Sequence, residues 1–215
     1  MNFKTVIFDL DGTLLNTLDD LANSANFALS EFNFPQRTRD EVRQFVGNGV
    51  RLLIERAVPV GTSDKTVDEC LEIFRGHYEK HKNDNTKPYD GILPTLSKLK
   101  EAGVKMAVVS NKYDLAVKEL CAPFFSSVID VAIGERENVR RKPAPDSVFE
   151  ALKTLGADKE SAIYVGDSDV DVQTAANAGI PCIGVTWGFR DREVLENAGA
   201  QYIIDKPEEI LDLVL

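Results

Sequence analysis

Short apolar runs rich in β-branched residues alternate along most of the chain with segments whose apolar residues recur every three or four positions. The runs have the length of strands that are covered on both faces. We expect six strands, at Lys4–Leu10, Val104–Ser110, Val128–Ile133, Ser161–Gly166, Ile180–Val185 and Gln201–Ile204. Helices are expected at Ile92–Ala102, Asp114–Cys121, Pro145–Leu155, Val170–Ala178 and Arg192–Ala198. This alternation predicts an α/β fold, a doubly wound parallel sheet with right-handed crossovers.

One long stretch, residues 16–86, interrupts the alternation. It shows no convincing strand but has four amphipathic stripes, of which the first begins at Leu18 and the last ends at Tyr78. Thr17 followed by Asp20 predicts a variant capping box at the start of the first helix. About 70 helical residues are too many for one crossover in a compact domain. We therefore expect a small helical bundle at 16–86, inserted into a core formed by 1–15 and 87–215.

Composition limits the possible partners and compartments. The 215 residues include 25 Lys and Arg against 35 Asp and Glu, a formal net charge of −10, which argues against nucleic acid or anionic lipid as the main partner. The three cysteines are far apart, which favours buried thiols in a reducing compartment over disulfides or a zinc site. No apolar run approaches the roughly 20 residues of a membrane span. Because a strand-like run begins at Lys4, we expect no signal peptide and a soluble, cytoplasmic protein.

The sharpest candidate chemistry follows the first predicted strand. Asp9 and Asp11 are two residues apart, so on an extended chain they face the same side, and Gly12 permits a sharp turn beside them. One carboxylate could attack phosphorus to give an aspartyl-phosphate, while the other moves the proton. A simple Asp-Gly turn would explain Asp11 and Gly12. It would not explain Asp9, a charge at the end of an apolar strand.

Further polar residues follow three other strands in sequence. They are Ser110 and Asn111, Lys142 before a proline, and Asp167 with Asp171. Ligands bind outside the carboxyl ends of the strands in open parallel sheets, so these groups are expected to gather there. Several carboxylates at one sheet edge repel one another unless a cation lies among them. Taken alone, Ser110-Asn111 is equally well explained as a cap of the following helix.

These four motifs, in this order, resemble those of the haloacid dehalogenase-like superfamily of phosphohydrolases. The first is D-x-D-G-T-L after an amino-terminal strand, and the last is G-D-x-x-x-D at Gly166–Asp171. The helical insert lies where that family has its type-one cap. Within the superfamily, the glycine loop of the insert, at Phe45–Val50, and the segment Val185–Phe189 are most similar to those of phosphoglycolate phosphatases. Because Asp11 is present, phosphoryl chemistry is expected and not dehalogenation.

The resemblance implies a role for each candidate residue. Asp9 is the nucleophile and Asp11 the general acid and base, while Mg²⁺ is held by Asp9, the backbone carbonyl of Asp11 and Asp167. Lys142 neutralises the nucleophile and the phosphoryl group, and Asp171 holds Lys142 or a metal-bound water. The residues expected to bind the phosphate are Gly12, Thr13, Ser110, Asn111 and Lys142.

Three features of the sequence permit two interpretations each. Gly47-Asn48-Gly49 could bring backbone N–H groups to a substrate anion, with Arg51 adding charge, or could simply separate two helices. His77 and His81 have a spacing found in some zinc sites, but no third ligand is near in sequence, so a structural role is favoured. Trp187 is explained better by packing than by substrate recognition.

We therefore expect a Mg²⁺-dependent phosphatase acting on a small phosphate monoester, with phosphoglycolate the favoured substrate and neither nucleic acid nor membrane as partner. The alternatives are a phosphomutase of the β-phosphoglucomutase type and a non-catalytic phosphate-binding module. The sequence is compatible with a monomer or a homodimer.

Overall fold

The computed structural model describes residues 3–215 of the protein. Met1 and Asn2, on which the expectation of no signal peptide partly rests, lie outside the described residues. The chain divides into two compact units. The first comprises the chain up to Leu15 together with Pro88–Leu215, and the second comprises Asn16–Lys87.

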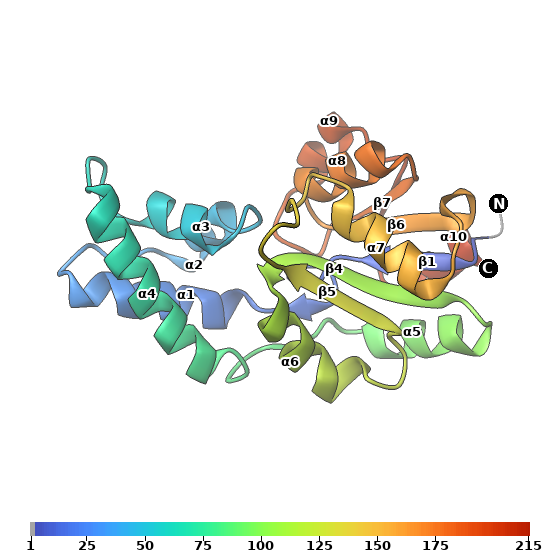
Figure 1. The fold of residues 1–215 in the computed structure, drawn as a ribbon, viewed down its shortest axis with the longest axis horizontal. Coiled ribbons are helices and arrows are strands. Elements are labelled where there is room, and N and C mark those ends of the chain that lie inside the picture. The colour runs from blue at the N-terminus through green and yellow to red at the C-terminus, as the bar shows by residue number, and fades with distance from the viewer. Residues whose placement is uncertain (1–2) are drawn as a thin grey trace. The chain divides into compact units, whose positions relative to one another are not determined.

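The first unit contains a six-stranded sheet whose neighbouring strands are all parallel (Figure 1). Its order is β5-β4-β1-β6-β7-β8. The strands are β1 (Thr5–Phe8), β4 (Lys105–Tyr113), β5 (Val131–Glu135), β6 (Ala162–Gly166), β7 (Cys182–Val185) and β8 (Tyr202–Ile204). All six correspond to predicted runs, which confirms the predicted fold class. β5 begins later than predicted because the backbone N–H groups of Val128 and Ile129 bond to the carbonyl of Phe125 in a turn after the preceding helix.

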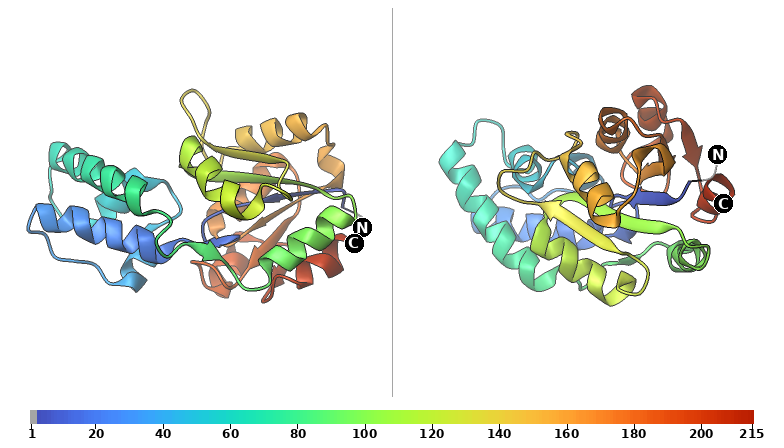
Figure 2. Two further views of the ribbon diagram at one scale, coloured as in Figure 1. Left: turned by 90° about the horizontal axis from the view of Figure 1, so that it is seen from below. Right: turned by 45° about the vertical axis from the view of Figure 1, so that its right-hand side comes forward.

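Helices cover both faces of this sheet (Figures 1 and 2). Val6 and Phe8 of β1 face the layer formed by α5, α6 and α10, whereas Ile7 faces α7, α8 and α9. The helices are α5 (Ile92–Glu101), α6 (Asp114–Phe125), α7 (Asp146–Leu155), α8 (Asp169–Ala178), α9 (Arg192–Ala198) and α10 (Glu209–Val214), with a short 3₁₀ turn at Lys159–Ser161. Side chains alternate between the two layers because successive strand residues point to opposite faces. The three cysteines are free and buried, as predicted.

The strand order determines where a ligand site can form. From β1 the sheet continues to β4 and β5 on one side, and the chain then returns to add β6, β7 and β8 on the other. The order therefore reverses between β1 and β6. In doubly wound sheets the crevice outside the carboxyl ends of the strands at such a reversal is the usual binding site.

The second unit contains four helices, and α1 packs along α4 (Figure 2). They are α1 (Leu18–Glu31), α2 (Arg39–Phe45), α3 (Val50–Ala57) and α4 (Asp64–His81). The predicted stripes supply the buried residues, among them Leu21, Leu53 and Phe74. Two short strands, β2 (Leu15–Asn16) and β3 (Lys87–Pro88), pair where the chain passes from one unit to the other. Within residues 3–215, no helix combines the length and apolar character that crossing a bilayer requires.

The capping box predicted from Thr17 and Asp20 is wrong. Thr17 precedes α1 but its side chain makes no capping hydrogen bond. The buried carboxylate of Asp20 instead accepts hydrogen bonds from Asn85 and Thr86, on the segment that leaves the unit. The donors are the two backbone N–H groups, the Asn85 amide and the Thr86 hydroxyl, at 2.8–3.0 Å. This long-range contact offers Asp20 more donors than a local cap would.

Asp20→Ala is expected to lower the free energy of unfolding by about 3 kcal/mol, because several buried donors to a charged acceptor lose their partner. Urea denaturation measures the change. Asp19→Ala is the matched control, since half-exposed Asp19 makes an ion pair with Arg39, and its loss is expected to cost less than about 1 kcal/mol. Equal losses in both variants would contradict the role assigned to Asp20.

Candidate active site

The first candidate motif follows β1 directly and is held to the neighbouring strand. The backbone N–H of Asp9 donates to the carbonyl of Val165 in β6, 2.9 Å away. The Asp9 side chain is buried, and that of Asp11, two residues on, is 12% exposed. Gly12 has φ +83°, and a Cβ there would lie 2.3 Å from Oδ2 of Asp167. Glycine is therefore required at position 12 for two reasons: the positive φ of the turn, and the close approach of the Asp167 carboxylate.

Asp167 follows β6 and is fixed from two sides. Its Oδ2 accepts the backbone N–H of Phe189 at 2.6 Å, and its Oδ1 accepts the Thr13 hydroxyl at 3.2 Å. Gly188 allows the loop after β7 to approach, since a Cβ there would lie 2.3 Å from Cβ of Asp167. Thr13, predicted to bind phosphate, thus orients Asp167 in this structure.

Lys142 lies between two carboxylates. Its Nζ is 2.8 Å from Oδ1 of Asp9 and 2.7 Å from Oδ1 of Asp171, and its side chain is only 3% exposed. It also donates to the hydroxyl of Tyr164 at 3.1 Å. Asp171 is oriented by its other oxygen, which accepts the backbone N–H and the hydroxyl of Ser168. Of the two roles that the resemblance allows for Asp171, the structure shows the contact with Lys142.

Burial and neighbouring charges shift the pKa values of these groups. It raises the pKa of Asp9 to about 7 despite the opposing effect of Lys142, and Asp171 and Asp11 add to the rise. Burial, with Asp171 and Asp9, also raises the pKa of Asp167 well above its usual range. For Lys142, burial lowers the pKa, but Asp171 and Asp9 raise it by more, so the ammonium stays charged. The raised pKa values of Asp9 and Asp167 indicate that a single ammonium does not offset the cost of burying these carboxylates in the ionised form.

The donor set fits a hard divalent cation. Asp9, Asp167 and Asp171 are all buried, and one oxygen from each lies within 4.8 Å of the others. Mg²⁺ prefers carboxylate oxygens and commonly takes only one or two of them from the protein. Both oxygens of Asp171 bond to protein groups, Oδ1 to Lys142 and Oδ2 to Ser168, whereas Lys142 contacts only Oδ1 of Asp9, so Asp9 is a better candidate for a direct ligand than Asp171. A cation there would also favour the ionised form of Asp9, which the nucleophile requires.

The raised pKa of Asp9 predicts how the metal-free protein responds to pH. Between about pH 4 and pH 7 the folded state holds a proton on Asp9 that the unfolded chain has lost, so stability falls as pH rises, by up to about 1.4 kcal/mol per pH unit. Thermal unfolding in EDTA from pH 5 to pH 8 measures this slope. Asp9→Asn is expected to reduce it, whereas an unchanged slope would show that Asp9 ionises normally.

The Ser110-Asn111 motif lies inside β4 and caps no helix. The residue preceding α6 is Tyr113, which makes no side-chain cap, so the helix-cap interpretation is wrong. Asn111 was expected to offer its amide to phosphate. In the structure it accepts from the backbone N–H of Lys142 at 2.8 Å and donates to the Lys142 carbonyl at 3.1 Å. The Ser110 hydroxyl accepts the backbone N–H of Lys112 at 3.2 Å.

Two contributors to the site, Tyr164 and Lys112, were not predicted, and Trp187 makes one contact beyond its predicted packing. Tyr164, a buried residue of β6, accepts from Lys142 and donates to the carbonyl of Val109. Trp187 packs against the core, as predicted, but its indole N–H also donates to the carbonyl of Thr13 at 3.0 Å. Lys112 lies 2.9 Å from Asp11. Of the two unpredicted residues, Lys112 had a signal in the sequence, because it is a charged residue directly after Ser110-Asn111.

The remaining candidates lie in the second unit. Gly47 and Gly49 have positive φ, and Gly49 immediately precedes α3, so the segment does separate two helices. Asn48 accepts a hydrogen bond from Arg56, and Arg51 forms ion pairs with Glu55 and Asp68. Binding of substrate by these four residues remains a prediction.

The two histidines of α4 form a stack of aromatic rings. Their ring centroids are 4.3 Å apart, and the Phe27 ring lies 4.2 Å from that of His77. The Nδ1 atoms of His77 and His81 contact Ser24 and Asp84. The histidines thus make structural contacts, as the sequence favoured.

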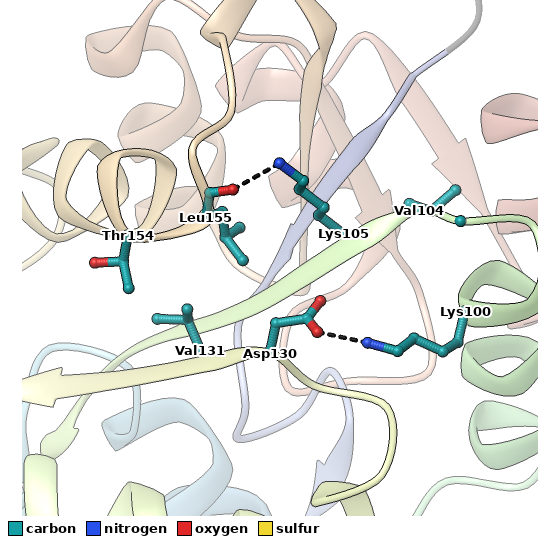
Figure 3. Close-up of a pocket in the computed structure, with 8 residues that line it drawn as sticks. Lys100, Val104, Lys105, Asp130, Val131, Thr154 and Leu155 are labelled. Atoms are coloured by element: carbon teal, nitrogen blue, oxygen red, sulfur yellow. Dashed lines mark hydrogen bonds and ion pairs between the residues drawn. The ribbon is translucent and has the colours of Figure 1, made fainter.

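A cavity of about 380 Å³ lies at the opposite edge of the sheet, where β4 and β5 begin (Figure 3). Its two lysines already have partners in the protein: Lys100 pairs with Asp130, and Lys105 donates to the carbonyls of Leu155 and Gly156. The buried acids are not among its lining residues. We therefore place the candidate chemistry at the carboxyl ends of the strands.

Comparison with known proteins agrees with this geometry. The family model described as haloacid dehalogenase-like hydrolase matches residues 6–185. The chain belongs to that family. The phosphoglycolate phosphatase of Aquifex aeolicus is 34% identical over 212 residues, covering 98% of this chain and 96% of that one. The phosphoglycolate phosphatase of Mesorhizobium japonicum is 34% identical over 200 residues, which cover 91% of this chain and 88% of that protein.

Solved structures show the same fold. A crystal structure from Lactobacillus delbrueckii subsp. bulgaricus superposes with a TM-score of 0.95 at 34% identity, covering 100% of this chain and 99% of the other. The protein is thus an enzyme of the haloacid dehalogenase-like hydrolases, and its relatives at this level of similarity are phosphoric monoester hydrolases.

Proposed function

We propose that this hydrolase is a Mg²⁺-dependent phosphatase that cleaves a small phosphate monoester, with phosphoglycolate as the favoured substrate. The observation that supports it most is the buried Asp9–Lys142–Asp171 arrangement with Asp167 close by, at the sheet edge where the strand order reverses. A cluster of buried acids is costly unless it binds a cation or a reacting group.

Asp9 attacks phosphorus in line, forming an oxygen–phosphorus bond while the ester oxygen leaves. Asp11 gives its proton to that oxygen and later accepts one from the water that attacks the aspartyl-phosphate, so that phosphate is released and both carboxylates return to their starting state. Lys142 stabilises negative charge on the transferring group from its position against Asp9. Asn111 and Tyr164 hold Lys142 in place.

Mg²⁺, held by Asp9, Asp167 and the backbone carbonyl of Asp11, would neutralise charge on the phosphoryl oxygens. Thr13 and Phe189 keep Asp167 oriented for this contact. Gly12, Thr13 and Ser110 remain candidates for contacts with phosphate through their N–H groups or hydroxyls. The helical second unit is proposed to supply specificity, with Gly47-Asn48-Gly49 and Arg51 as its candidate contacts.

Phosphoglycolate is favoured because relatives that match nearly the whole chain carry that activity in their names. A phosphomutase would return the phosphoryl group to an organic hydroxyl, and a binding module would be expected to have lost at least one of the four charged residues Asp9, Asp11, Lys142 and Asp167. All four are present.

A phosphate-release assay over a panel of small phosphate esters, with Mg²⁺ or with EDTA, tests the proposal. We expect one equivalent of free phosphate per substrate consumed, fastest with phosphoglycolate, and background rates in EDTA. Loss of substrate without free phosphate would favour the mutase. Failure to turn over any ester in Mg²⁺ would favour the binding module.

A further inference from the structure

The site contains a second buried lysine, which contacts Asp11. Lys112 lies near the end of β4, and its side chain is only 6% exposed. Its ammonium is 2.9 Å from Oδ1 of Asp11. Its backbone N–H donates to the Ser110 hydroxyl, which fixes the chain beside it. A charge with so little exposure is costly unless it has a partner or a function.

The two lysines serve different ends of a phosphate ester. Lys142 contacts Asp9, so its charge lies where the phosphoryl group is attacked. Lys112 contacts Asp11, which in the proposed reaction protonates the ester oxygen of the leaving group. A proton donor must be within hydrogen-bond reach of that oxygen, so if Oδ1 of Asp11 carries the proton, the Lys112 ammonium would be within about 6 Å of the ester oxygen. Positive charge is therefore present where the organic part of the substrate begins.

This position suits a leaving group with its own negative charge close to the ester oxygen. In an ester of a 2-hydroxy acid, one carbon separates the ester oxygen from the carboxylate, so the carboxylate falls within reach of the same ammonium. An ammonium has three donors and can contact Asp11 and a substrate carboxylate together. A neutral hydroxyl at the same place would gain much less from the contact, because hydrogen bonds between two charged groups are the stronger ones.

We propose that Lys112 binds the substrate carboxylate and selects phosphate esters of 2-hydroxy acids over neutral esters of the same size. The inference rests on the proposed phosphatase function. Lys112, a residue of the first unit, would then discriminate between substrates by the charge of their leaving group.

The test compares phosphoglycolate with 2-hydroxyethyl phosphate, which replaces the carboxylate with a hydroxymethyl group. In the wild-type enzyme with Mg²⁺, the ratio of the two kcat/KM values is expected to be about 10 to 100 in favour of phosphoglycolate. In Lys112→Met the ratio should fall to near one, mainly through a higher KM for phosphoglycolate. Lys112→Arg keeps the charge and should restore part of the ratio.

The ratio separates recognition from a merely structural role, because a damaged site would slow both substrates alike. Lys118→Met, which removes an exposed lysine of α6 paired with Asp114, is the matched control and should leave the ratio unchanged. An unaltered ratio in Lys112→Met, or a wild-type ratio near one, would overturn the inference while leaving the phosphatase proposal intact. A wild-type enzyme that hydrolyses neither ester would contradict the proposed function, and the inference with it.

Discussion

Asp9→Asn is expected to lower kcat by at least about 10⁴-fold, because an amide cannot form the covalent phosphoryl intermediate. The substitution keeps the size of the side chain and removes only its charge and nucleophilic oxygen. Phosphate release from phosphoglycolate with saturating Mg²⁺ measures the loss. Residual activity above one per cent of wild type would contradict the assignment of Asp9 as nucleophile.

Asp169→Asn is the matched control for this prediction. Asp169 lies in the acidic motif between Asp167 and Asp171, but its carboxylate faces Arg190 at 3.8 Å and is 42% exposed. The control variant should therefore keep nearly full activity. If both variants lost activity equally, general damage to the acidic cluster would explain the result better than loss of a nucleophile.

Lys142→Met is expected to lower kcat by about 10²- to 10⁴-fold, because the buried positive charge beside Asp9 no longer stabilises the transferring group. It should also destabilise the metal-free protein by about 3 kcal/mol, since Asp9 and Asp171 lose the ammonium between them. Enzyme assays and urea denaturation give the two values.

Mg²⁺ provides a further check on the Lys142 variant. A cation bound by Asp9 and Asp167 would partly replace the missing charge, so added Mg²⁺ should stabilise Lys142→Met while restoring little activity. A variant as stable and as active as wild type would contradict the role given to Lys142. Lys118→Met, on the exposed surface of α6, controls for the exchange of lysine for methionine.

Most strands and helices of the first unit could be predicted from the sequence because its strands are buried on both faces. Continuous apolar runs such as that around β6 occur where helices cover both sides of a sheet, and the structure shows such layers. The last helix, α10, was missed because its six residues are too few to show a helical period. The two-residue strands β2 and β3 carry no pattern at all.

The principal acids could be anticipated because strand ends in a parallel sheet meet at one edge. Asp9 and Asp167 follow strands that are neighbours in the observed order, although they are 158 positions apart in sequence. What the sequence could not show is which partner each polar group takes. Asn111 bonds to the backbone of Lys142, and Asp20 bonds to Asn85 and Thr86, both across long stretches of chain.

Tyr164 illustrates the remaining gap. In the sequence it is one apolar-looking position within a buried strand, and nothing distinguishes it from its neighbours. Its hydroxyl is informative only in three dimensions, where it lies 3.1 Å from the Lys142 ammonium. A side chain whose role depends on a partner that is distant in sequence leaves no recognisable pattern in the residues around it.

Trapping the covalent intermediate tests the central claim most directly. Enzyme mixed with phosphoglycolate and Mg²⁺ is quenched during turnover, reduced with borohydride and mapped by mass spectrometry. The account predicts that an acyl phosphate on Asp9 is reduced to the alcohol, so that the peptide containing residue 9 carries homoserine there, and that this product is absent without substrate. Turnover at full rate with Asp9 unmodified, or with the modification on another carboxylate, would contradict it.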